Sequence, residues 1–162
     1  MTEPQQAAAG TIQLFTDGAC SGNPGCGGWA YILRHGPSGK EQTRWNVEQD
    51  TTNNRMELMG VIAGLEALTH GCEVDLYTDS EYVGKGIRDW MPSWKRRGWK
   101  RAGGKTIKNL DLWQRLDQQV QRHQIHYCPV RGHSGHPENE LCDELAVAAY
   151  LGTAPAATRA KD

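Results

Sequence analysis

The sequence lacks any apolar run close to the roughly 20 residues that a membrane-spanning helix requires. Its 162 residues are 38% hydrophobic and 23% charged, which is ordinary for a globular protein, so the composition excludes the membrane as its location. The first ten residues, MTEPQQAAAG, contain no basic segment followed by an apolar core, which argues against a secretory signal peptide. We therefore expect a cytoplasmic protein.

The five cysteines form no C-x-x-C pair and are odd in number. This pattern predicts reduced thiols rather than a zinc site or a redox site. A chain of this length fits one domain, and it contains neither an internal repeat nor a linker. We expect a single domain over residues 11–151, with flexible tails at residues 1–10 and 152–162.

Acidic residues are absent between Met91 and Leu110, although the net charge of the whole chain is only −1. Seven of the 18 basic residues lie in this segment, namely Lys95, Arg96, Arg97, Lys100, Arg101, Lys105 and Lys108. Such a separation of charge predicts a basic protrusion, at about residues 91–108, that meets an anionic partner. The alternative is a merely solvated loop.

Alternating and helically spaced apolar residues predict an α/β domain built on a five-stranded mixed sheet with helices on both faces. Strands are expected at 11–17, 29–35, 40–47, 72–80 and 124–132, and helices at 53–68, 81–87, 109–122 and 136–150. The glycine-rich stretch at 18–28 is expected to be a turn, and the first three strands to form an antiparallel meander. A side chain from Thr51, Thr52 or Asn53 should cap the first long helix.

Four acids occupy unusual places in this pattern: Asp17 and Asp79 end strands, while Glu57 and Asp143 lie in helices. Singly, each is more readily a cap, a turn residue or part of a solvated face. Three of them sit in apolar local sequence, where an isolated carboxylate would carry a large desolvation penalty, so a cation should compensate them. Carboxylates without nearby cysteines or a histidine pair suit Mg²⁺ or Mn²⁺, and four can hold two ions about 3.5–4 Å apart for phosphodiester cleavage.

Three tryptophans, Trp90, Trp94 and Trp99, are interleaved with the basic residues of the protrusion. Lysine and arginine residues interleaved with aromatic rings favour a nucleic-acid partner. The positive side chains bind phosphates, and the rings offer flat surfaces on which nucleobases can stack. The alternative for each ring is packing of a basic helix against the core.

Six motifs carry a resemblance to one family. FTDGACSGNPG, TTNNRMEL, YTDSEYV, WKRRGWK, KNLDLWQRLD and VRGHSGHPENELCDELA resemble the successive motifs of bacterial ribonuclease HI, in the order that family has them, over roughly residues 11–150. The resemblance implies a ribonuclease H-like fold and a monomer that cleaves the RNA strand of RNA–DNA hybrids. It also implies Mg²⁺ or Mn²⁺, two ions per active site with substrate bound, and products with 5′-phosphate and 3′-hydroxyl ends.

The resemblance assigns roles to single residues. Asp17, Glu57, Asp79 and Asp143 match the family's catalytic, metal-binding carboxylates, and Asp17 matches the ligand that touches both ions. His133, in RGHSGH, matches a catalytic loop histidine that could move a proton or help release product, whereas His136, beside Pro137, is expected to be a surface histidine.

The resemblance also implies contacts with the hybrid. Asn23, Asn53 and Asn54 match minor-groove contacts, and Thr52 caps the helix or binds a DNA phosphate, so that 2′-hydroxyls and groove shape select the strand. The expected substrate-binding residues are Asn23, Thr52, Asn53, Asn54, Glu81, Trp90, Trp94, Lys95, Arg96, Arg97, Trp99, Lys100 and Asn109.

Two positions depart from the family pattern. Asp50 stands where a basic residue is expected, and Glu81 replaces the glutamine that normally follows Asp-Ser; both add negative charge near phosphates and should weaken binding or raise the metal requirement. Two rival functions are a hybrid-binding module without catalysis and a nuclease or integrase of the same architecture that acts on DNA. The four acids with His133 argue against the first, and TTNNRMEL with WKRRGWK against the second.

Overall fold

The computed structural model describes residues 12–131 and 136–161 and confirms the predicted five-stranded mixed sheet, in the order β3-β2-β1-β4-β5. The first three strands form the expected antiparallel meander, while β4 runs parallel to both β1 and β5. The strands are β1 (Ile12–Cys20), β2 (Gly25–His35), β3 (Glu41–Thr51), β4 (Glu73–Thr78) and β5 (Gln124–Pro129).

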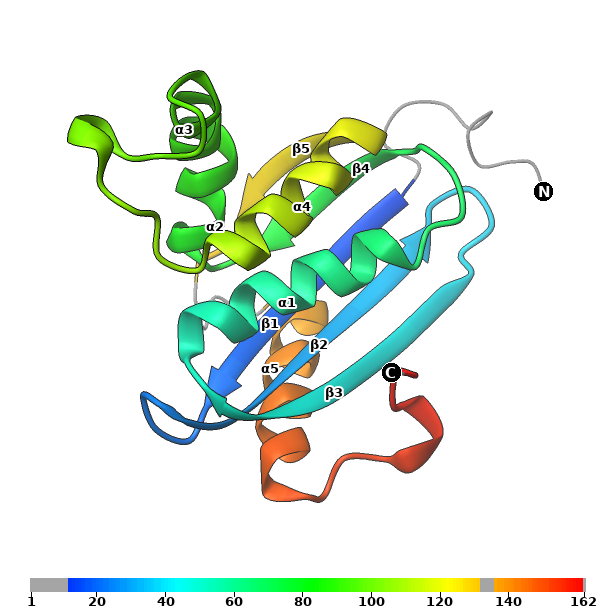
Figure 1. Ribbon diagram of the computed structural model, residues 1–162. Helices are drawn as coiled ribbons and strands as arrows, with labels where there is room; N and C mark the ends of the chain where they lie inside the picture. Colours follow the sequence, from blue (N-terminus) through cyan, green and yellow to red (C-terminus); the bar gives the residue numbers. More distant parts are fainter. Residues whose placement is uncertain (1–11, 132–135, 162) are drawn as a thin grey trace.

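Helices cover both faces of this sheet, as predicted. On one face lie α1 (Asn53–Glu66) and α4 (Leu110–Arg122), and on the other lies α5 (Pro137–Leu151) (Figure 1). Beyond β4, α2 (Glu81–Lys85), a π-helical turn at Gly86–Trp90 and α3 (Met91–Arg96) lead into the basic protrusion. Short 3₁₀ turns follow at Ala102–Gly104 and Ala156–Thr158. Among the helices of the described residues, none is long and apolar enough to cross a membrane.

The core has one layer on each side of the sheet, because consecutive residues of a strand point to opposite faces. Leu14 of β1 is fully buried with Met56 and Ile62 of α1, whereas the next residue, Phe15, is buried with Cys142 of α5. A strand buried on both faces belongs at the centre of a sheet. The end of β1 is therefore held rigidly between α1 and α5.

The glycine-rich stretch differs from the prediction of one long turn. Ala19 and Cys20 of β1 pair with Gly28 and Gly27 of β2, so that only residues 21–24 turn the chain. A Cβ atom on Gly28 would collide with the Ala146 carbonyl of α5. These glycines therefore allow close packing within a longer hairpin.

The C-terminal segment also differs, because the expected flexible tail is held against β3 over its described part. The Trp45 indole N–H donates to the Pro155 carbonyl at 2.8 Å, and the Ala160 N–H donates to the Trp45 carbonyl at 2.8 Å. The Arg159 guanidinium lies 5.5 Å from the centre of a Trp45 ring. The reason is that β3 is an edge strand with unpaired backbone groups, which this segment satisfies in part. The tail expected at residues 1–10 lies outside the described residues.

Candidate active site

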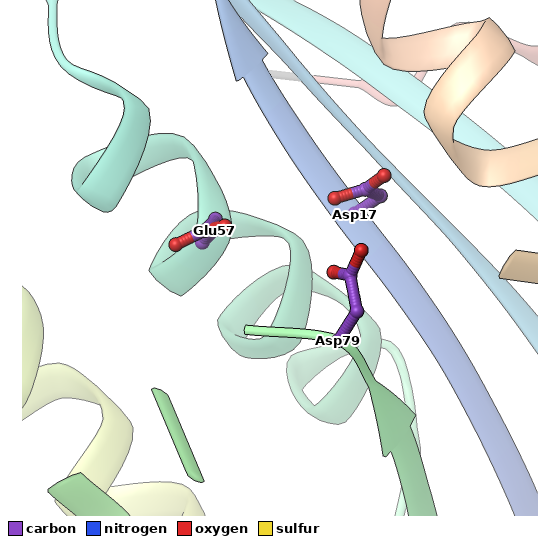
Figure 2. A group of neighbouring side chains, drawn as sticks. All are labelled: Asp17, Glu57 and Asp79. Atoms are coloured by element: carbon purple, nitrogen blue, oxygen red, sulfur yellow. The ribbon is translucent and has the colours of Figure 1, made fainter. Parts of the chain in front are cut away.

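Three carboxylates from three elements meet at one edge of the sheet. Asp17 comes from β1, Asp79 directly follows β4, and Glu57 comes from α1 (Figure 2). One oxygen of each lies within 4.8 Å of the others. Because β1 and β4 are parallel neighbours, their carboxyl ends, and the acids they carry, share that edge.

The fourth predicted acid reaches the same place from the opposite face of the sheet. A pocket of about 220 Å³ is lined by side chains that include Asp17, Glu57, Asp79, Asn139, Arg131 and Asp143. Asp143 lies on α5 and is close enough to Asp17 to share a hydrogen bond with it. All four carboxylates that the sequence singles out therefore line one pocket.

The approach of α1 to β1 depends on Gly18. A Cβ atom at this position would collide with the backbone of Met56 and Glu57, so any larger residue would push α1 away from the strand. The Gly18 N–H also donates to Asp17 Oδ1 at 2.8 Å. Gly18 thus allows Glu57 to lie beside Asp17 and helps to orient the Asp17 carboxylate.

The electrostatics of the pocket favour a bound cation. Burial is the largest effect on Asp17 and, with the charges of Asp79 and Asp143, raises its pKa to about 8. The hydrogen bond from the Gly18 N–H acts in the opposite direction and lowers the pKa. Burial also raises the pKa of Glu57, although the Ser80 hydroxyl works in the other direction. A bound divalent cation would offset the burial and the mutual repulsion that raise these pKa values. A site made only of oxygen donors suits a hard cation. The residues present therefore fit a site for a hard divalent cation.

We expect Asp17→Asn to stabilise the metal-free protein by several kcal/mol at pH 8, because each unit of pKa difference between the folded and unfolded states corresponds to about 1.4 kcal/mol. The pKa of Asp17 is about 8 in the folded protein and 3.8 in the unfolded chain. At a pH between these two values, the folded protein keeps a proton on Asp17 that the unfolded chain has released. The stability of the wild type therefore falls as the pH rises through this window, and the variant escapes that fall. Urea unfolding in EDTA at pH 4 and pH 8 measures the effect; a variant with no advantage at pH 8 would contradict it.

The predicted minor-groove residues gather at the start of α1. The Asn23 side-chain oxygen accepts from the Asn53 N–H at 3.3 Å, so the turn between β1 and β2 lies against this helix end. Thr52 is the N-cap, and its hydroxyl accepts from the Arg55 N–H at 3.2 Å, which confirms one of the expected caps. Asn53 and Asn54 are exposed, so their amides can reach a ligand.

Asn109 has partners within the protein. Its amide nitrogen donates to the Tyr82 hydroxyl at 3.0 Å, and its amide oxygen accepts from Arg55 at 3.2 Å. The Arg55 guanidinium also forms a bidentate ion pair with Asp111, with distances of 3.0 and 2.8 Å. Asn109 thereby joins α1, α2 and the start of α4, and in this state its side chain is used structurally.

The basic protrusion contains two kinds of cation. Arg96, Arg97 and Lys100 are exposed, as a phosphate-binding role requires. Lys95 is exposed too, but its Nζ atom lies 3.0 Å from Asp117 Oδ1, and the Asp117 side chain is only 8% exposed. A buried carboxylate needs this counter-charge, so Lys95 holds α3 onto α4.

The tryptophans of the protrusion pack largely as the alternative predicts. The Trp90 and Trp94 rings lie 6.3 and 5.4 Å from the buried Trp113 ring, and Trp99 also packs against the core. Trp90 and Trp94 remain half-buried, and with Arg101 they line an open pocket of about 650 Å³. Packing therefore fixes these rings while leaving Trp90 and Trp94 accessible from that pocket.

Comparison with known proteins agrees with this geometry, since the family model for RNase H matches residues 9–150. This chain belongs to the RNase H family. A Ribonuclease H from Rhodopirellula baltica is 59% identical over 148 residues, covering 90% of this chain and 94% of the relative. A Ribonuclease HI from Pseudomonas putida KT2440 is 55% identical over 136 residues, covering 84% and 90%.

Solved structures of the RNase H family show the same architecture. LC9-RNase H1, described as a type 1 RNase H with the type 2 active-site motif, is 35% identical, with a TM-score of 0.78, over 92% of this chain and 76% of that one. The PFV RNase H domain shares the fold at 20% identity, with a TM-score of 0.75, over 91% and 98%. The predicted ribonuclease H-like fold is therefore confirmed.

The structure describes only one of the two histidines in the RNase H motif RGHSGH. His133 lies outside the described residues. His136 is not the surface histidine that the sequence predicts, because it is half-buried, with its ring 5.7 Å from Tyr77 and 5.6 Å from Phe15. These aromatic contacts come from β1 and β4 and could not be inferred from the neighbouring Pro137.

Two polar residues of this RNase H site were missed by sequence reasoning. The Ser80 hydroxyl donates to Glu57 Oε1 at 2.8 Å. The Asn139 amide donates to the carbonyls of Thr16 and Tyr77, at 3.3 and 2.9 Å, and so ties α5 to the ends of β1 and β4. Ser80 could have been found as a helix cap directly after Asp79, but its partner on α1 has no signal in the sequence.

Proposed function

We propose that this protein is an endonuclease that hydrolyses the RNA strand of RNA–DNA hybrids, leaving 5′-phosphate and 3′-hydroxyl ends. The observation that carries this proposal is the meeting of Asp17, Glu57 and Asp79 within 4.8 Å, at the sheet edge of an RNase H fold. RNase H enzymes are metal-dependent nucleases, and this acidic pocket fits a divalent ion.

We assign Asp17, Glu57, Asp79 and Asp143 as ligands of Mg²⁺ or Mn²⁺, with two ions held when substrate is present. When bound, such ions stabilise the attacking and leaving oxygens of phosphodiester cleavage. Asp17 interacts electrostatically with both Asp79 and Asp143, which supports it as the shared ligand. Holding β1, β4, α1 and α5 together keeps these carboxylates in place before substrate arrives.

For proton movement we propose His133, on the basis of its match to the family's loop histidine. A histidine titrates near neutrality, so it can take up and release a proton at physiological pH. Arg131 and His136, the described residues on either side of His133 in the sequence, both line the acidic pocket, which supports this proposal.

For substrate recognition we propose that Asn23, Asn53 and Asn54 contact the minor groove at the start of α1. Further along the hybrid, the phosphate backbone would be held by the exposed basic side chains of Arg96, Arg97 and Lys100. The accessible faces of Trp90 and Trp94 would contact the hybrid beside them. We also propose that the protein acts as a monomer in the cytoplasm; its five free cysteines fit a reducing compartment.

The test is incubation of the protein and Mg²⁺ with end-labelled RNA–DNA, RNA–RNA and DNA–DNA duplexes. We expect cleavage of the RNA strand of the hybrid alone, with 3′-hydroxyl products that a polymerase can extend. Binding of the hybrid without cleavage would favour a binding module, and cleavage of the DNA duplex would favour the DNA-processing alternative. Either outcome would contradict the proposal.

We expect Glu81→Gln to tighten hybrid binding about two- to threefold at low Mg²⁺. Glu81 follows the site at the start of α2, its side chain is 80% exposed, and it lies 3.4 Å from Lys85. An amide removes repulsion toward phosphates and can donate a hydrogen bond, and the gain should shrink as salt screens the charge. Hybrid dissociation constants in Ca²⁺ measure this effect.

The matched control is Glu73→Gln, which makes the same change of charge at the opposite end of β4. We expect this control to leave binding unchanged. Weaker binding by the Glu81 variant would instead mean that Glu81 recruits a cation, and a Mg²⁺ titration of cleavage would then show a higher metal requirement.

A further inference from the structure

Ser80 joins two parts of the molecule through one hydroxyl group. It is buried, with 4% of its surface exposed, between Asp79 and the first residue of α2. Its Oγ atom accepts from the Val83 N–H at 3.1 Å as the N-cap of α2, and it donates to Glu57 Oε1 of α1 at 2.8 Å. A capping residue in this fold therefore also contacts a carboxylate of the acidic pocket.

The direction of this hydrogen bond follows from the chemistry of the hydroxyl. A serine hydroxyl has one proton, and the bond from Val83 occupies an acceptor position, so the proton is available for Glu57. The Ser80 N–H in turn donates to the buried Thr78 hydroxyl at 3.0 Å, which fixes the turn after β4. Ser80 is thus held from both sides, and its hydroxyl is oriented toward Glu57 before any ligand binds.

Glu57 needs such support because its side chain is long and could adopt other rotamers. Asn53, one turn earlier on α1, also hydrogen-bonds the Glu57 carboxylate. Asn53 is exposed and belongs to the expected substrate contacts, whereas Ser80 is buried. Ser80 is therefore the support of Glu57 that stays in place when the hybrid engages the start of α1.

We propose that Ser80 is a positioning residue for the divalent-cation site, holding the Glu57 carboxylate beside Asp17 and Asp79. The inference rests on the proposed function, since it requires Glu57 to be a metal ligand. Hydrogen-bond partners of metal ligands typically contribute 10–100-fold to metal affinity, because they reduce the freedom that binding must remove. Ser80 does this while also starting the helix that leads to the basic protrusion.

The first experiment measures Mg²⁺ and Ca²⁺ binding to the whole protein by calorimetry, without substrate. We expect Ser80→Ala to weaken binding about tenfold and to raise the Mg²⁺ concentration for half-maximal hybrid cleavage to a similar extent. Turnover at saturating Mg²⁺ should stay within about threefold of the wild type, since Glu57 itself remains. Ser80→Thr, which keeps both the cap and the donor, should restore the affinity.

The matched control is Val120→Ala, which removes packing from α4 away from the pocket and lowers the melting temperature without touching Glu57. We expect wild-type metal affinity from this control. Equal metal affinity of Ser80→Ala and the wild type, or equal losses in Ser80→Ala and Val120→Ala, would overturn the inference. Failure of the proposed function would look different, because the wild type itself would then show no Mg²⁺-dependent cleavage.

Discussion

Asp17→Asn is expected to reduce cleavage of an RNA–DNA hybrid at least a hundredfold in saturating Mg²⁺, while the hybrid still binds. Asparagine has nearly the shape of aspartate but loses the charge that holds a divalent ion, and metal positioning contributes several kcal/mol to such reactions. Asp79→Asn should behave in the same way. Single-turnover cleavage of an end-labelled hybrid, with binding measured by fluorescence anisotropy in Ca²⁺, separates the two effects.

The control for this result is Asp89→Asn, the same change on the exposed π-helical turn, which should cleave like the wild type. The melting temperatures of both proteins, measured in the Mg²⁺ buffer of the assay, separate a loss of activity from unfolding. Activity above about a tenth of the wild type would contradict the assignment of Asp17 as a metal ligand.

Neutralising the exposed lysine and arginine residues of the protrusion is expected to weaken hybrid binding tenfold or more at moderate salt. The variant changes to glutamine the residues Arg96, Arg97, Lys100 and Arg101. Each lost phosphate contact should reduce the slope of log affinity against log salt by roughly one. Michaelis constants across a salt series measure this slope, and turnover at saturation should be largely kept because the carboxylates are untouched.

Lys95 is left unchanged in this variant because it neutralises the buried Asp117, and its loss would destabilise α3 and α4. Neutralising Lys40 and Lys161, which lie on other parts of the surface, is the control and should barely alter the slope. If the protrusion variant keeps the wild-type slope, the segment is only a solvated loop and the phosphate-binding role is wrong.

The sequence predicted the strands and helices whose apolar patterns depend only on residues nearby in the chain. The alternation that begins with Ile12 and Leu14 and the helical spacing of Leu58, Ile62 and Leu65 depend on neighbours along the chain, so the strand and the helix were found. The acids at strand ends were found for the same reason. Asp17 and Asp79 meet in one pocket because β1 and β4 are parallel neighbours, whose carboxyl ends lie at the same edge.

The missed features depend on partners far away in the sequence. The pairing of Lys95 with Asp117 gives an expected substrate contact a structural partner as well, and the hydrogen bond between Trp45 and Pro155 makes an expected tail part of the fold. Ser80 and Asn139 have ordinary local sequence, and their roles appear only where α1, α5 and two strands converge. Local patterns cannot show which polar groups will share a buried space.

The placement of Asp17 on the first strand and Asp143 on the last helix has a consequence for how the protein is made. A chain emerging from the ribosome can pair β1 with β2, and β2 with β3, early, but these contacts leave the acidic pocket incomplete. Only when α5 has left the exit tunnel can its Asn139 amide bind the strand ends and bring Asp143 beside Asp17. The nascent chain therefore lacks the fourth carboxylate of the pocket until nearly all of the domain has been translated.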